Sequence, residues 1–181
     1  FNLNSGQSIT ITGPNGVGKT LLLNTIVGFK SIFKGKISIN KINLSNDPSN
    51  RQEHIGYYGH KASIHTGLTV METIEYWKAY YSSDANTFDL IKFWDLPNKT
   101  VENCSEGQRK RIALVRLFLM KRNIWLLDEP TTNLDIIGKK KFSDLHTSHL
   151  ETGGLSIITT HEAAQFKGHK IINLGKHCDL I

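Results

Sequence analysis

One eight-residue segment constrains the fold of this chain more than any other feature. Residues 13–20 read Gly-Pro-Asn-Gly-Val-Gly-Lys-Thr, which matches the pattern G-x-x-x-x-G-K-[ST]. A β-branched run at residues 9–12 precedes the segment and an apolar run at residues 21–27 follows it. A strand, a glycine-rich loop and a helix are therefore expected in that order, and the loop is predicted to hold a phosphate group. A loop that only reversed the chain would not require Lys-Thr at the helix start.

Every position of this loop has a predicted part in holding a nucleotide. The glycines let backbone N–H groups approach phosphate oxygens, and the helix N-terminus adds its positive end. Lys19 is expected to reach the β- and γ-phosphates, and the Thr20 hydroxyl is expected to ligate Mg²⁺. The residues predicted to contact the nucleotide in this segment are Gly13, Pro14, Asn15, Gly16, Val17, Gly18, Lys19, Thr20 and Leu21.

The distribution of apolar runs predicts an α/β fold. Runs at residues 8–12, 123–127 and 155–160 are each followed by a turn or polar residues and then by helix-like sequence, which favours a parallel sheet flanked by helices. Two further runs, at residues 36–39 and 55–58, flank a polar stretch. We expect this pair to form an antiparallel β edge region with a surface loop between its strands.

The middle of the chain has helical rather than strand periodicity. Met71, Ile74, Trp77 and Tyr81 recur at helical spacing, which favours core packing over docking of a partner, and a second helix is expected after Cys104 and Ser105. The prediction is a single domain spanning residues 1–181. Its nucleotide-binding core would take about residues 1–58 and 122–181, and a small helical subdomain would take about residues 59–121.

Two acidic residues end the apolar run at residues 124–129. In a parallel sheet such an end lies at the ligand-binding edge, near the phosphate loop. Asp128 is predicted to belong to the Mg²⁺ shell with Thr20, usually through water, and Glu129 to orient or deprotonate the attacking water. His161 follows the later strand and is predicted to contact the γ-phosphate or that water. The predicted catalytic residues are thus Glu129, His161 and Lys19. The alternative for the two acids is a charged strand end exposed to solvent, and for the histidine it is a satisfied surface or core residue.

Composition sets broader limits. The chain has 181 residues, of which 39% are hydrophobic, enough for one domain with a core. Its net charge of +6 fits an anionic ligand, a nucleic acid or an anionic membrane surface. No apolar run approaches the roughly 20 residues that span a bilayer, so we expect a soluble domain, and its start suggests that an N-terminal segment was cut away. Cys104 and Cys178 fit no disulfide framework, which favours a reducing compartment.

A further motif gives the chain a family resemblance. Residues 104–108 read Cys-Ser-Glu-Gly-Gln and lie between the phosphate loop and the acidic strand. This ordered set resembles the ATP-binding cassette ATPases, whose signature is often Leu-Ser-Gly-Gly-Gln, and the resemblance covers essentially the whole chain. It implies a P-loop NTPase core in which Ser105, Gly107 and Gln108 bind ATP held by a second copy, so that two ATP molecules join a dimer. Without the family, Ser105 is a helix cap.

Other positions follow the family or depart from it. Residues 132–135 resemble the loop in which an aspartate, here Asp135, couples the two sites of the dimer. The family's glutamine that senses Mg²⁺ and the membrane partner is replaced by His60, with Lys61 as the alternative, and the loss of the amide weakens the case for direct metal contact. Leu21 stands where many members have a second hydroxyl, which removes a hydrogen bond worth about 0.5–1.5 kcal/mol. The adenine-stacking residue would fall before Phe1.

Three features of the chain are the short helical lobe, the Gly-His segment at residues 59–69 and the run at residues 109–114. Within the family, they most resemble the ATP-binding subunits of cytochrome c maturation haem exporters. That resemblance implies an ATPase of the translocase type with integral membrane subunits as partners. It also implies a peripheral position on the cytoplasmic face of an inner membrane, or on the matrix face of the mitochondrial inner membrane.

Two other interpretations stay open. A cassette acting on the ribosome or nucleic acid usually has a second cassette or long insertions, which this chain lacks, so no direct nucleic acid is expected. A pseudo-enzyme that only binds ATP would not need both Glu129 and His161. A basic cluster is interpreted as a solvated helix face rather than a nucleic-acid patch; it consists of Arg109, Lys110, Arg111, Arg116, Lys121 and Arg122.

Overall fold

The computed structural model describes residues 1–59, 64–161 and 170–176. The chain forms two compact units. The first contains residues 1–60, 122–130 and 148–181, and the second contains residues 61–121 and 131–147. The sequence-based subdomain limits stay a prediction.

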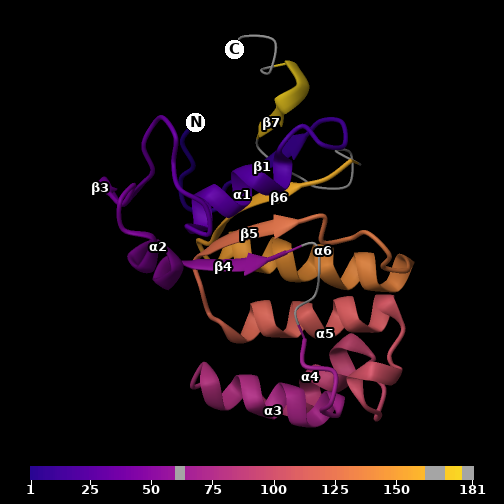
Figure 1. Ribbon diagram of the computed structural model, residues 1–181. Helices are drawn as coiled ribbons and strands as arrows, with labels where there is room; N and C mark the ends of the chain where they lie inside the picture. The colour runs from indigo at the N-terminus through magenta and orange to yellow at the C-terminus, as the bar shows by residue number, and fades with distance from the viewer. Residues whose placement is uncertain (60–63, 162–169, 177–181) are drawn as a thin grey trace. The chain divides into compact units, whose positions relative to one another are not determined.

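The first unit is built on a parallel sheet with the strand order β4-β5-β6-β1-β7 (Figure 1). Every pairing between neighbours in this sheet is parallel. The expected α/β fold and its three main strands are confirmed, with strand ends that move by a residue at most. The strands are β1 (Ser8–Thr12), β4 (Ile55–Tyr58), β5 (Ile124–Asp128), β6 (Leu155–Thr159) and β7 (Lys170–Asn173).

The core of this unit lies where helix α1 (Lys19–Val27) meets the sheet. Near-continuous apolar strands of this kind are typical of parallel sheets, because helices cover their faces. The fully buried Ile9 and Ile11 of β1, Leu23 of α1 and Leu126 of β5 belong to one hydrophobic cluster. This packing holds the start of α1 at the carboxyl end of β1, which is where the predicted phosphate loop must lie.

The expected antiparallel region is present, but the prediction that the run at residues 55–58 belongs to it was wrong. β4 pairs in parallel with β5, and antiparallel pairing occurs instead between the short strands β2 (Ser38–Ile39) and β3 (Ile42–Asn43). The intervening polar stretch is partly a helix, α2 (Pro48–His54), which Asp47 caps by accepting from the Asn50 N–H. Asp at the cap and Pro at the first turn favour such a helix. The parallel pair of β4 and β5 is joined by the long connection between residues 58 and 124.

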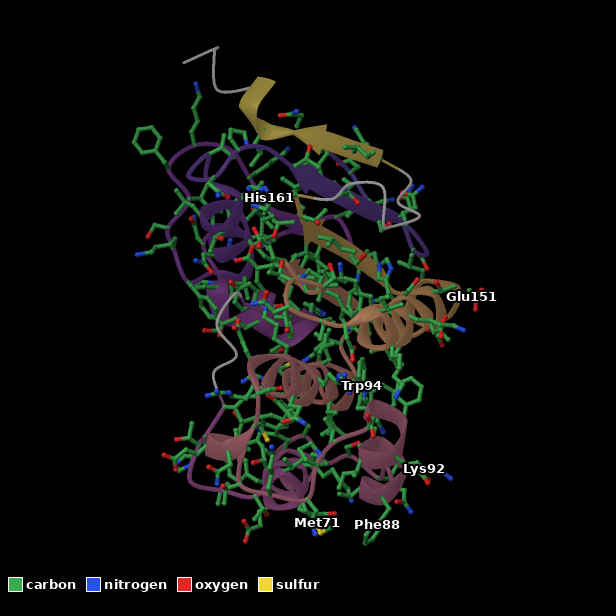
Figure 2. All side chains as sticks on the ribbon, turned by 90° about the vertical axis from the view of Figure 1, so that its right-hand side faces the viewer. Met71, Phe88, Lys92, Trp94, Glu151 and His161 are labelled. Carbon is green, nitrogen blue, oxygen red and sulfur yellow. The ribbon has the colours of Figure 1, made fainter. Side chains whose placement is uncertain are left out.

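The second unit contains the two helices predicted for the middle of the chain, α3 (Val70–Tyr80) and α5 (Glu106–Leu119). It also contains a helix that was not predicted, α4 (Thr87–Trp94), and a 3₁₀ turn, η1 (Val101–Asn103). Ile74 and Trp77 are buried, as their spacing predicted. In Figure 2, Phe88 and Lys92 of α4 point outward, whereas Trp94 is buried. The start of α6 (Ile136–Glu151) belongs to this unit, and a last 3₁₀ turn, η3 (Leu174–Lys176), belongs to the first.

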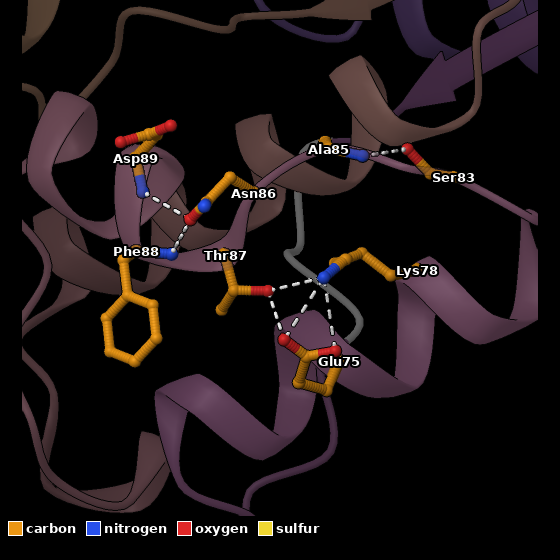
Figure 3. Close-up of polar contacts among 8 residues, drawn as sticks. All are labelled: Glu75, Lys78, Ser83, Ala85, Asn86, Thr87, Phe88 and Asp89. Carbon is orange, nitrogen blue, oxygen red and sulfur yellow. Dashed lines mark hydrogen bonds and ion pairs between the residues drawn. The ribbon is translucent and has the colours of Figure 1, made fainter.

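A polar cluster joins α3 to the start of α4 (Figure 3). The Lys78 ammonium contacts both carboxylate oxygens of Glu75 at 3.2 Å and donates to the Thr87 hydroxyl at 2.9 Å. The same hydroxyl donates to Glu75, and Asn86 caps α4 by accepting from the N–H groups of Phe88 and Asp89. No helix in the described part of the chain is long and apolar enough to cross a membrane.

Candidate nucleotide site

The loop between β1 and α1 has the geometry of an anion cradle. Gly16 and Gly18 have φ of +80° and +101°, values that glycine adopts without steric cost. A Cβ on either residue would meet no described atom within 4 Å, so the loop leaves open space beside its backbone. In α1, all of which the structure describes, no side chain caps the N-terminus and no acid lies in the first turn. The first N–H groups of α1 are therefore disposed to bind a phosphate.

Lys19 is a buried cation, only 7% exposed, held inside this loop. Its ammonium donates to the carbonyl oxygens of Gly13, at 2.8 Å, and of Pro14, at 3.1 Å. An ammonium has three donors, and a buried charge is stabilised by an opposite charge. A phosphate entering the loop would supply that charge at the position where Lys19 is already anchored.

Thr20 and Asp128 lie side by side, as predicted. The Thr20 hydroxyl donates to Asp128 Oδ2 at 2.8 Å, and the Thr159 hydroxyl donates to Asp128 Oδ1 at 2.6 Å. Adjacent ligands of an octahedral Mg²⁺, each about 2.1 Å from the ion, lie about 3 Å apart. The oxygens of Thr20 and Asp128 are hard ligands at nearly that separation, so these two residues fit a Mg²⁺ ion. Asp128 is 1% exposed, so the negative charge of a buried carboxylate would also attract the ion.

Glu129 lies just past β5 and contacts His161, which lies just past β6. The Glu129 carboxylate is 2.9 Å from His161 Nε2, and Lys19 Nζ is 3.5 Å from the same nitrogen. A carboxylate can only accept, so the shorter contact requires that Nε2 carries a hydrogen and donates it to Glu129. Lys19, His161 and Glu129 thus form a row at the carboxyl ends of the strands, and Figure 2 labels His161 at this edge.

The backbone at Glu129 is strained. Its φ is +49°, which is uncommon for a residue with a side chain, and its N–H is held by the carbonyl oxygen and the hydroxyl of Thr159. Such strain costs about 1–3 kcal/mol and clusters at functional sites. Asp128 and Glu129 contact different partners, as expected. The direction of the Glu129 side chain, toward His161, is set by the left-handed backbone at Glu129, which lies beyond the end of β5.

The signature segment lies in the second unit, at the start of α5. The Ser105 hydroxyl accepts from the Gln108 N–H at 3.2 Å, while the Gln108 side chain accepts from the Ser105 N–H at 3.0 Å. This is a capping box, so the interpretation of Ser105 as a helix cap holds. A Cβ on Gly107 would lie 2.9 Å from the carbonyl oxygen of Asn133, which explains a glycine at that place.

Asp135 is held by two groups of the same unit. The Gly138 N–H donates to one carboxylate oxygen at 2.8 Å, and Arg111 of α5 contacts the other at 2.6 Å. The Gly138 N–H, assisted by the Arg111 charge, keeps the pKa of Asp135 below its ordinary value. The aspartate is therefore ionised and fixed relative to the signature helix.

The interpretation of the basic cluster as a solvated helix face was wrong for most of its members. Lys110 is buried, and of the six residues only Lys121 is exposed. Arg111 is paired with Asp135, Arg116 lies over the Trp77 ring at 5.6 Å, and Lys121 is paired with Asp84. These cations serve contacts within the protein, because one side of α5 is packed along its whole length.

The structure does not place every predicted residue at the site, and it adds residues that were not predicted from the sequence. His60 and Lys61 lie outside the described residues, and Leu21 is 57% exposed on the first turn of α1. Thr159, which holds both Asp128 and Glu129, was not singled out; a hydroxyl near the end of an apolar strand was the available signal. The sequence indicates Arg111 only as a member of the basic cluster, because its partner Asp135 lies 24 residues away and is brought to it by the fold.

These features define the class of protein. Residues 1–132 match the ABC transporter family. The chain belongs to this family as an ATP-binding subunit, which confirms the resemblance drawn from its motifs.

Two relatives that carry the name CcmA are similar to this chain over most of its length. The cytochrome c biogenesis ATP-binding export protein CcmA of Nitrobacter winogradskyi is 35% identical over 162 residues, which cover 87% of this chain and 79% of that protein. CcmA of Paracoccus denitrificans is 34% identical over 178 residues, which cover 97% of this chain and 79% of that protein.

Solved structures agree on the fold. A putative ABC transporter ATP-binding protein from Pyrococcus furiosus has a TM-score of 0.82 at 23% identity and covers 97% of this chain and 88% of its own. A dimeric ATP-binding cassette in a post-hydrolysis state, bound to ADP and Pi, has a TM-score of 0.81 at 25% identity, with 96% of this chain and 83% of that chain covered.

Proposed function

We propose that this chain hydrolyses MgATP as one half of a dimer and drives a transporter that serves cytochrome c biogenesis by exporting haem. One observation carries the proposal. Five side chains from three distant segments, at the carboxyl ends of β1, β5 and β6, meet in two sets of contacts, Lys19–His161–Glu129 and Thr20–Asp128, and the Thr159 hydroxyl joins the two sets. The five side chains are those of Lys19, Thr20, Asp128, Glu129 and His161.

The roles follow from the chemistry of each group. Residues 13–20 bind the phosphates, and Lys19 places its positive charge against them. Thr20 and Asp128 would hold Mg²⁺, which would neutralise charge on the phosphate oxygens. Glu129 aligns the attacking water and accepts its proton, and His161, which donates to Glu129 in the present contact, supports charge on the transferred phosphoryl group with Lys19.

A second copy of the chain completes the proposed site. Ser105, Gly107 and Gln108 would contact the γ-phosphate of the opposite copy, and Asp135 would couple the two sites. Two large apolar side chains next to Asp135 support a self-association surface there, since Ile136 is 87% exposed and Ile137 is 61% exposed. The dimeric relative bound to ADP and Pi gives the same kind of support. His60 keeps its proposed place as a residue near the γ-phosphate.

The proposed partners are integral membrane subunits, with the chain bound peripherally to the cytoplasmic face of an inner membrane or to the matrix face in a mitochondrion. The names of its CcmA relatives support this assignment. The internal contacts of the basic residues give no support to direct nucleic-acid binding.

The test is a pull-down from native membranes with the tagged subunit as bait, followed by mass spectrometry and an absorbance scan for haem. Recovery of membrane subunits of cytochrome c biogenesis is the expected result, and a Lys19→Ala bait shows which partners depend on nucleotide. Recovery of ribosomes or nucleic acid without a membrane protein would overturn the transport assignment while leaving the ATPase chemistry in place.

A further inference from the structure

We infer that Glu106 and Asn133 form a charge gate at the start of α5, the helix end that would receive ATP from the second copy. The inference rests on the proposed function. Asn133 holds the Glu106 carboxylate against the loop at residues 131–135, and this position keeps the N-terminus of α5 open to a phosphate. Asn133 is a positioning residue in this arrangement, and Glu106 sets the affinity for ATP.

Glu106 puts a negative charge at the proposed phosphate contact. It is the first residue of α5 and stands in the signature segment where the family often has glycine. Its side chain is exposed, and Oε1 accepts a 2.6 Å hydrogen bond from Asn133 Nδ2. An acid in the first turn of a helix is attracted to the partial positive charge of that helix end, so it competes there with any other anion.

The loop that carries Asn133 is fixed to α5 within the same unit. Asn133 has φ of +62°, a conformation that asparagine tolerates better than most residues. Its carbonyl oxygen approaches Gly107 so closely that a Cβ there would lie 2.9 Å away. Two residues later, Asp135 is paired with Arg111 at 2.6 Å. The amide of Asn133 is therefore presented to Glu106 by a loop tied to α5 at two points.

Without this hydrogen bond the carboxylate has a nearby alternative. The Gln108 N–H is taken by the Ser105 hydroxyl, but the N–H groups of Glu106 and Gly107 have no hydrogen-bond partner in the part of the chain that the structure describes. These are the orphan donors of a helix N-terminus, and a free carboxylate one residue away is drawn toward them. It would then repel the phosphate that the same donors are proposed to bind.

The test is a double-mutant cycle in the full-length subunit, with KM for ATP, kcat and ATP-dependent dimerisation as readouts. Glu106→Gln removes the charge and keeps an oxygen that accepts from Asn133, so KM is expected to fall. Asn133→Ala frees the carboxylate, so KM is expected to rise about twofold to fivefold, the size of a charge effect at a helix end, with kcat unchanged. In the Glu106→Gln background, Asn133→Ala should leave KM unchanged.

The dependence of KM on salt concentration provides a second readout, because dissolved ions weaken the interactions of exposed charges. The rise in KM caused by Asn133→Ala should shrink when the ionic strength is raised. An equal rise in both backgrounds, or no rise with Glu106 present, overturns the gate and leaves the proposed function standing. A wild-type subunit that neither hydrolyses ATP nor dimerises with it overturns the proposed function, and the gate with it.

Discussion

The hydroxyl of Thr20 donates a 2.8 Å hydrogen bond to Asp128, although the two residues are 108 positions apart in the chain. Thr20 lies in the first turn of α1, and Asp128 is the last residue of β5. The second carboxylate oxygen of Asp128 accepts from Thr159 of β6. Two hydroxyls from neighbouring elements thus fix a buried carboxylate at the mouth of the phosphate loop.

Replacing Thr20 with Val should weaken the binding of ATP in the presence of Mg²⁺ by roughly tenfold, which is the scale of losing one bond to a charged group. Thr20→Ser, which keeps the hydroxyl, serves as the control and should bind like the wild type. Titration with a fluorescent nucleotide, in Mg²⁺ and in excess EDTA, measures the effect. An equal loss in both conditions would mean that Thr20 only supports the loop.

Replacing Glu129 with Gln should reduce ATP turnover by about 10²–10⁴-fold, because an amide cannot take the proton of the attacking water. Binding of ATP should persist, so dimers should accumulate in ATP and appear in size-exclusion chromatography with light scattering. The matched control is Glu151→Gln at the exposed end of α6, labelled in Figure 2, which should hydrolyse ATP like the wild type. Near-normal turnover by Glu129→Gln would remove this residue as the base.

The parts of the site that were predictable from the sequence depend on short-range patterns. The phosphate loop is contiguous, its glycines and Lys-Thr are fixed by the geometry of a strand-to-helix turn, and the loop formed where the pattern placed it. The signal for the start of α5 is equally short-range, because a serine followed three residues later by glutamine makes a capping box. The ends of β5 and β6 were placed because a parallel sheet brings all its carboxyl ends to one edge.

The parts that were not predictable depend on contacts between distant residues. The partner of β4 is β5, which follows only after the long helical segment between them, and no local pattern at residues 55–58 shows this parallel pairing. The burial of Lys110 follows from packing along α5 and not from its own charge. The role of Thr159 depends on the pairing of β6 with β5, which brings its hydroxyl to the Asp128 carboxylate.

Thr87 should contribute to the stability of the helical unit through its buried hydroxyl, which lies between Lys78 and Glu75 (Figure 3). Thr87→Val keeps the shape and removes the hydrogen bonds, so the free energy of unfolding should fall by about 1 kcal/mol. Thr87→Ser is the control, because it retains the hydroxyl and loses only the methyl group, so it separates the effect of the hydrogen bonds from that of the methyl group. Urea unfolding followed by circular dichroism gives both values, and equal stability of Thr87→Val and wild type would contradict the assignment.

His149 should make the stability of the first unit depend on pH. Its ring stacks on Trp125 with centroids 3.7 Å apart and an interplanar angle of 5°, and its Nε2 is 3.3 Å from the carbonyl oxygen of Leu155. Burial lowers the pKa of His149 below its ordinary 6.5, and carbonyl contacts only partly offset this. The unfolded chain therefore binds the proton first, so the stability present above about pH 6.5 is lost as the pH falls.

The variant His149→Phe keeps a flat ring on Trp125 but cannot take up a proton. Urea unfolding of both proteins at about pH 7.5 and about pH 5.5, on either side of the ordinary histidine pKa, isolates the contribution of this residue from that of the other histidines. The wild type should lose more free energy of unfolding between the two pH values than His149→Phe does. If both proteins lost the same amount, the stacked imidazole would have the same proton affinity folded and unfolded, and the pH dependence would have to come from other groups.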